Sequence, residues 1–135
     1  MKYMVMPRHD LSARYGGGWA LVTGASDGIG KRYCFELAKS GFNIILMARN
    51  KDKTAAVAQE ITEKYSNVQT KTIIYDFSNL STQGSAEELK ALLERELDGV
   101  DVSILVNNVG TARNAPLENQ SFSDLTHQIN ININA

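Results

Sequence analysis

The chain has a single cysteine, Cys34, and only two histidines and two prolines among its 135 residues. One cysteine excludes an internal disulfide and a cysteine-based zinc site, and two distant histidines form no local metal motif. The longest apolar stretches run only a few residues, so we expect neither a transmembrane helix nor a signal peptide. An excess of one charge is also missing, because 14 Lys and Arg oppose 15 Asp and Glu. We therefore expect no nucleic-acid partner.

From Trp19 onward, short apolar runs alternate with longer segments of helical periodicity. The apolar runs are residues 19–23, 43–48, 68–75 and 102–106, and the periodic segments are 28–39, 52–65 and 85–97. This order, with nearly continuous apolar strands, predicts an α/β fold: a doubly wound parallel sheet covered on both faces. Residues 1–18 are interpreted as an irregular N-terminal segment, and residues 19–135 as one domain.

The first predicted strand ends in a glycine-rich loop that leads directly into a helix. Gly24 permits a tight turn, Gly28 lets the backbone approach a pyrophosphate, and Gly30 allows close helix–strand packing. The helix N-terminus adds free amides and a partial positive charge. The loop therefore predicts dinucleotide binding, and a glycine-rich turn without a ligand is the alternative. The other loop residues expected at the site are Ser26, Asp27 and Ile29.

Three motifs in order resemble the short-chain dehydrogenase/reductase family. Residues 23–30 are similar to its TGxxxGxG signature, and residues 107–110, Asn-Asn-Val-Gly, are similar to its NNAG motif. Asp76 follows the third strand, where the family commonly has an acidic residue that contacts the adenine. Residues 14–31 and the Asn-Asn-Val-Gly variant resemble the very-long-chain 3-ketoacyl-CoA reductase and 17β-hydroxysteroid dehydrogenase type 12 group. That resemblance implies that the protein depends on NADPH and that the complete protein is located in the endoplasmic reticulum membrane. The chain as it stands is expected to be soluble and intracellular.

Arg49 follows the second strand, about twenty residues past the glycine loop. A carboxylate at this place would bind the ribose 2′-OH of NAD, whereas a guanidinium suits the 2′-phosphate of NADP. Lys51 and Lys53 add positive charge nearby, and Asp52 is expected to cap the following helix. The residue pattern predicts NADP as the cofactor, and the alternative is that Arg49 is a solvated loop residue.

Polar residues also follow the third and fourth strands, at the edge where ligands of open α/β sheets bind. Asp76 could accept a hydrogen bond from adenine or could form a turn, and the resemblance favours adenine. The resemblance implies that Asn107 supports the central sheet and that Gly110 lets the backbone approach the cofactor ribose. Asn108 belongs to the same predicted site, with an Asn-rich turn as the alternative.

The end of the chain alternates Ile and Asn over residues 128–135, a pattern that by itself indicates a strand. The resemblance instead places it in the long helix after the fourth strand and aligns Asn132 with the family's catalytic Asn, which orders a water in a proton relay. Cys34 is expected to serve packing, and His9 and His127 are expected to be solvated or structural.

The family's chemistry also needs a Ser and a Tyr with a Lys four residues later, and none of the five Tyr has that Lys. We therefore interpret the chain as the NADPH-binding portion of a reductase. The alternative is a non-catalytic nucleotide-binding or structural module held by a partner chain. Residues 104–106 are fully apolar on a strand expected at the sheet edge, which predicts self-association or a partner chain covering that edge.

Overall fold

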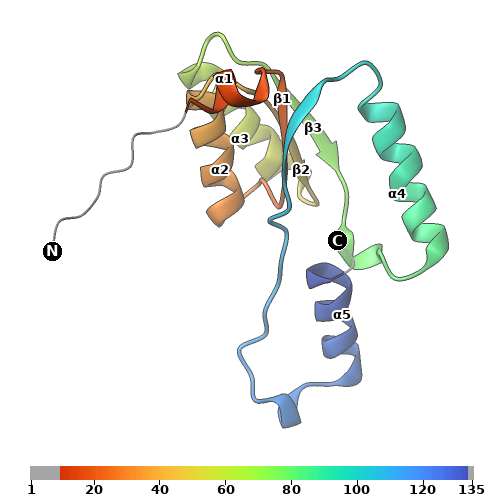
Figure 1. The fold of residues 1–135 in the computed structure, drawn as a ribbon. Coiled ribbons are helices and arrows are strands. Elements are labelled where there is room, and N and C mark those ends of the chain that lie inside the picture. Colours follow the sequence, from red (N-terminus) through yellow and green to blue (C-terminus); the bar gives the residue numbers. More distant parts are fainter. Residues whose placement is uncertain (1–9, 134–135) are drawn as a thin grey trace, which may run out of the picture.

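The computed structural model describes residues 10–133, which form a four-stranded parallel sheet flanked by helices (Figure 1). The strands are β1 (Trp19–Thr23), β2 (Asn43–Ala48), β3 (Thr70–Ile74) and β4 (Val102–Val106), in the order β3-β2-β1-β4. The helices are α1 (Leu11–Tyr15), α2 (Gly28–Lys39), α3 (Lys51–Lys64), α4 (Gln83–Glu96) and α5 (Phe122–Asn132), with 3-10 turns η1 (Phe77–Asn79) and η2 (Leu117–Asn119). The predicted doubly wound α/β fold is confirmed.

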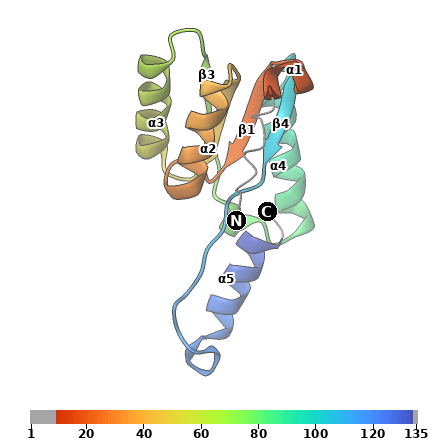
Figure 2. The ribbon, with the colours of Figure 1, turned by 60° about the vertical axis from the view of Figure 1, so that its left-hand side comes forward.

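Successive side chains of the strands point to opposite faces of the sheet and supply two cores. Ala20 and Val22 face the core that α2 and α3 cover, whereas Leu21 faces the core on the α4 side (Figure 2). Strand β2 lies in the interior of the sheet, and its residues 44–46 have no exposed surface. The apolar strand sequences are therefore explained by burial on both faces.

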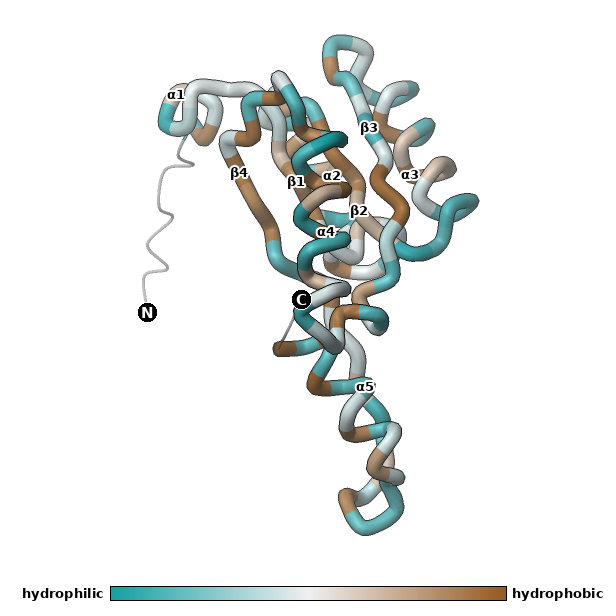
Figure 3. The backbone as a smooth tube through the Cα atoms, turned by 90° about the vertical axis from the view of Figure 1, so that its right-hand side faces the viewer, coloured by the Kyte–Doolittle hydropathy of each residue, from teal (hydrophilic) through white to brown (hydrophobic). Residues whose placement is uncertain are grey.

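The α4 side of the sheet and the β4 edge are less covered than the α2–α3 side. No residue of α4 is buried, although its leucines pack partly against the second core. Within the described part of the chain, strand β4 pairs only with β1, and its Leu105 is 59% exposed. Figure 3 shows β4 as a largely hydrophobic strand at the sheet edge. A register shift leaves Ser103 without a paired residue in β1, and a bulge of this kind is one of the devices that discourage edge pairing.

The predicted irregular N-terminal segment contains a short helix. Residues 11–15 form α1 because the Asp10 side chain caps it, accepting a hydrogen bond from the Ala13 amide at 2.9 Å. Gly16, Gly17 and Gly18 then turn the chain with φ values of 78°, 75° and 89°. His9 lies outside the described residues.

Other boundaries also differ from the sequence prediction, among them those of α4, which spans Gln83–Glu96 rather than residues 85–97. Helix α3 begins at Lys51 and is capped by Asn50, whose side chain accepts from the Lys53 amide at 2.9 Å, so the expected cap at Asp52 was wrong. Strand β3 is shorter than predicted, and Ile74 at its end is 42% exposed. The Ile–Asn repeat is helical through Asn132, as the family resemblance implied, and residues 134–135 lie outside the described range. Among the described helices, none is long and apolar enough to cross a membrane.

Candidate functional site

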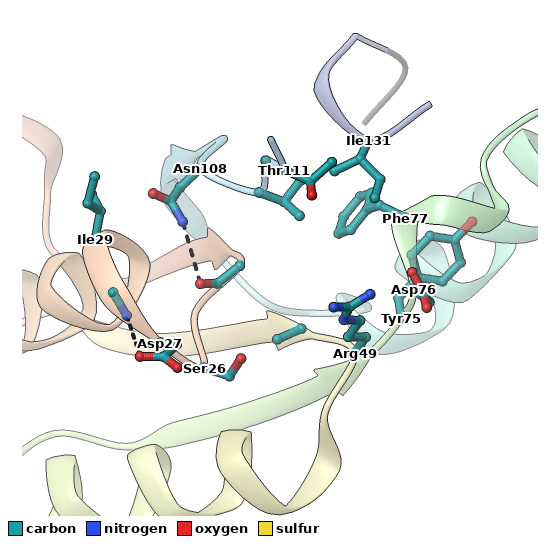
Figure 4. A pocket seen from close by; sticks show the side chains of 15 residues that line it. Ser26, Asp27, Ile29, Arg49, Tyr75, Asp76, Phe77, Asn108, Thr111 and Ile131 are labelled. Carbon is teal, nitrogen blue, oxygen red and sulfur yellow. Dashed lines mark hydrogen bonds between the residues drawn. The ribbon is translucent and has the colours of Figure 1, made fainter. Parts of the chain in front are cut away.

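A pocket of about 470 Å³ lies at the carboxyl ends of the strands (Figure 4). Because β2 and β3 extend the sheet to one side of β1 and β4 lies on the other, the strand order reverses between β1 and β4. Ligands of open α/β sheets bind at this reversal. The predicted residues that line the pocket are Gly24, Ser26, Asp27, Gly28, Ile29, Arg49, Asp76, Asn108 and Gly110.

The three loop glycines have separate roles. Gly24 (φ +64°) lies against the loop that follows β4, and a Cβ at Gly24 would be 2.9 Å from the Asn108 side-chain nitrogen. A Cβ at Gly30 would be 2.3 Å from the Gly24 carbonyl oxygen, so Gly30 serves helix–strand packing and does not line the pocket. Gly28 (φ +53°) lines the pocket, and a Cβ there would meet no protein atom within 4 Å. Gly28 is therefore the glycine with open space beside its backbone.

The side chain that caps the N-terminus of α2 is a carboxylate. Asp27 caps the helix, accepting from the Gly28 amide at 2.8 Å, and its other oxygen lies 3.2 Å from Lys53 Nζ. Among residues 10–133, the next two amides, of Ile29 and Gly30, have no acceptor. The hydrogen bond from Gly28 and the Lys53 ammonium hold the pKa of Asp27 below its ordinary value. The first turn of α2 therefore offers two free amides beside an ionised carboxylate.

Thr23 and Asn108 join the ends of β1 and β4. Thr23 Oγ1 accepts from the amides of Asn108 at 2.9 Å and Val109 at 3.0 Å. The Asn108 side chain donates to the Thr23 carbonyl at 3.0 Å. Asn108 therefore links the ends of the two strands, whereas Asn107, to which the resemblance assigned support of the sheet, is exposed and does not line the pocket. The sequence analysis did not single out Thr23 as a site residue, although it is the first residue of the stretch that resembles the TGxxxGxG signature.

Arg49 and Asp76 face the same part of the pocket. The Arg49 side chain is exposed and points into the pocket from the end of β2 (Figure 4). Asp76 caps η1 through the Ser78 amide at 3.0 Å, so it is a turn former that also lines the pocket. Burial raises the pKa of Asp76, but the Ser78 hydrogen bonds and the charges of Arg49 and His127 outweigh it and lower the pKa. His127, on α5, is thus an electrostatic neighbour of Asp76.

The Asn132 side chain links α5 by hydrogen bonds to the loop that follows β4. Its side-chain oxygen accepts from the Thr111 amide and its nitrogen donates to the Thr111 carbonyl, both at 2.8 Å. A Cβ at Gly110 would be 3.4 Å from the same Asn132 oxygen. Asn132 does not line the pocket, and its water-ordering role remains a prediction. Lining residues that the sequence analysis did not single out are Ala48, Tyr75, Phe77, Val109, Thr111 and Ile131.

Cys34 is a residue of α2 that faces the core and does not line the pocket. It has no exposed surface, and burial raises the pKa of its thiol to about 12. A thiol this resistant to ionisation is a poor nucleophile, which agrees with the packing role expected from the sequence.

Sequence comparison finds a family and several curated proteins that are similar to this chain. The sequence profile of the family described as short chain dehydrogenase matches residues 18–135. A very-long-chain 3-oxoacyl-CoA reductase of Caenorhabditis briggsae is 44% identical over 114 residues, which cover 84% of this chain and 34% of that protein. The chain spans about a third of the length of the relatives it matches.

Solved structures agree with the sequence comparison. A 7β-hydroxysteroid dehydrogenase superposes with a TM-score of 0.75 at 28% identity, covering 91% of this chain and 44% of that one. An L-sorbose reductase of Gluconobacter frateurii, solved with NADPH and L-sorbose, superposes with a TM-score of 0.71 at 26% identity, covering 87% and 42%. The fold expected from the sequence is therefore shared with reductases of known structure.

Proposed function

Because the chain belongs to the short-chain dehydrogenase family, we propose that its pocket binds NADPH and that it forms the cofactor-binding part of a 3-oxoacyl-CoA-type reductase. In such a reductase the bound cofactor supplies a hydride to a ketone. The residues of the pocket fit NADPH. Gly28 leaves space beside free helix amides that suit a pyrophosphate, and the Asp76 carboxylate can accept a hydrogen bond from adenine. Asn108 and Gly110 lie where the cofactor would leave the glycine loop.

One observation carries the choice of NADPH: Arg49 points into the pocket from the end of β2 (Figure 4). No carboxylate stands at that position, where one would bind the ribose of NAD and repel a 2′-phosphate. Charge-assisted hydrogen bonds from a guanidinium to a phosphate contribute roughly 1.5–3 kcal/mol. Arg49 therefore favours the phosphorylated cofactor.

We expect Arg49→Ala to weaken NADPH binding about tenfold or more and to leave NADH binding nearly unchanged. Isothermal titration of the whole chain with each cofactor measures both affinities. Arg95→Ala, which removes an exposed guanidinium from the end of α4, is the matched control and should change neither affinity. Equal losses for NADPH and NADH would contradict the 2′-phosphate role, and failure of the wild-type chain to bind either would contradict the proposed function.

A second candidate, a module held by another chain, is favoured by the exposed apolar edge at β4. The backbone groups on the outer side of β4 and the Leu105 side chain offer a template for strand pairing. We expect the chain to self-associate at micromolar concentration in sedimentation velocity, and Leu105→Lys to shift it toward monomer. Leu117→Lys, at a residue 69% exposed on η2, is the control and should not alter the distribution. A monomeric wild type with cooperative unfolding would exclude self-association.

A further inference from the structure

An ion pair joins the first turn of α3 to the glycine loop. Lys53 Nζ lies 3.2 Å from the Asp27 carboxylate, although the two residues are 26 positions apart in the sequence. Both side chains are solvent-exposed, with 60% and 77% of their surfaces accessible, so the pair contributes little to the stability of the fold. Its position suggests a different role, because Asp27 lines the same pocket as Arg49.

An ionised carboxylate at this place opposes the binding of a phosphate. Asp27 already accepts from the first amide of α2, and a helix N-terminus attracts anions. A cofactor with an additional phosphate would meet the negative charge of Asp27 and the positive charge of Arg49 in one pocket. Unless Asp27 is neutralised, its repulsion cancels part of the attraction that Arg49 supplies.

Lys53 is the cation placed to neutralise Asp27. Lys31 also influences Asp27 electrostatically, but its ammonium lies 2.8 Å from Glu60. Lys51, in the same turn as Lys53, forms no ion pair within residues 10–133. Lys53 itself does not line the pocket, and its ion pair with Asp27 connects it to a residue that does.

We propose that Lys53 is a positioning residue that sets the preference for NADPH over NADH by neutralising Asp27 in the pocket that Arg49 also lines. The proposal rests on the proposed function, because it takes the pocket to be the cofactor site. It explains why an acidic residue is compatible with a phosphate-binding loop in this chain. It also gives Lys53 and Lys51 different roles, although both add positive charge to the same segment.

The test is a double-mutant cycle measured by isothermal titration of the whole chain with NADPH and with NADH. We expect Lys53→Ala to weaken NADPH binding about five- to tenfold and NADH binding less than about twofold. Asp27→Asn keeps a capping side chain while removing the charge. In the Lys53→Ala background it should restore NADPH affinity to within about twofold of wild type, and Lys53→Arg should retain it.

Lys51→Ala is the matched control and should leave both affinities unchanged. Thermal unfolding of each variant checks that the fold is retained. Equal losses for the two cofactors in Lys53→Ala, or no recovery in the double variant, would overturn the proposal while the proposed function stands. A wild-type chain that binds neither cofactor would overturn both.

Discussion

Gly30→Ala is expected to destabilise the fold by about 3 kcal/mol, although alanine is the better helix former. The added Cβ would lie 2.3 Å from the Gly24 carbonyl oxygen and 2.5 Å from the Asn108 side-chain nitrogen. The Gly24 oxygen belongs to the backbone of the loop, so relief requires α2 to move away from β1. That movement would also disturb the amides at the start of α2, and dinucleotide binding should fall with stability.

The matched control is Gly84→Ala, in the first turn of α4. The nearest atom to a Cβ there is Thr82 Oγ1 at 3.8 Å, an ordinary contact, and φ is not in the left-handed region. We expect this variant to be neutral or more stable by about 0.5–1 kcal/mol, because alanine reduces the entropy lost on helix formation. Urea unfolding of both variants gives the comparison. Similar free energies of unfolding would show that α2 and the loop can separate without cost.

Three of the four strands could be predicted at both ends from the sequence, including the partly exposed edge strand β4. Strands β1, β2 and β4 begin and end at the predicted residues, because apolar runs closed by polar or glycine residues mark both limits. The third strand ends earlier than predicted, because Ile74 is half-exposed and Tyr75 already lines the pocket. Apolar character alone does not distinguish an apolar strand residue from an apolar pocket residue.

The helix boundaries could be predicted less well because caps depend on single backbone conformations. Asn50 adopts the extended conformation of an N-cap (φ −93°, ψ 105°), whereas Asp52 lies inside the first turn, where its charge complements the helix dipole. The Ile–Asn repeat becomes helical because Ser121 and Asp124 form a capping box and Asn132 pairs with Thr111. None of these contacts is visible in the period-two pattern.

The candidate site could be predicted where its residues directly follow a strand, since the fold brings all carboxyl ends to one edge. The glycine loop, Arg49, Asp76 and Asn108 were found in this way and do surround one pocket. The Thr23 network could not be predicted, because it depends on the distance between β1 and β4. The same holds for the Lys53–Asp27 pair, which exists only because α2 and α3 pack side by side on one face of the sheet (Figure 2).

Thr23→Val is expected to destabilise the chain by about 2–4 kcal/mol, although valine has nearly the same shape and a high strand propensity. The Thr23 hydroxyl is the acceptor for the amides of Asn108 and Val109, and valine leaves both without a partner. Thr23 is only 5% exposed, so water cannot readily replace the lost acceptor. Since Asn108 and Val109 both line the pocket, their displacement should also weaken NADPH binding in titration.

Thr23→Ser retains the hydroxyl and should recover most of the lost stability in urea unfolding, apart from the small effect of the deleted methyl group. Thr62→Val is the matched control: its hydroxyl donates only to helix carbonyls on the exposed side of α3, and its removal should change stability by less than about 0.5 kcal/mol. If Thr23→Ser were as unstable as Thr23→Val, the methyl contact rather than the hydroxyl would hold the ends of β1 and β4 together. The hydroxyl explanation requires the serine variant to resemble wild type both in its free energy of unfolding and in its affinity for NADPH.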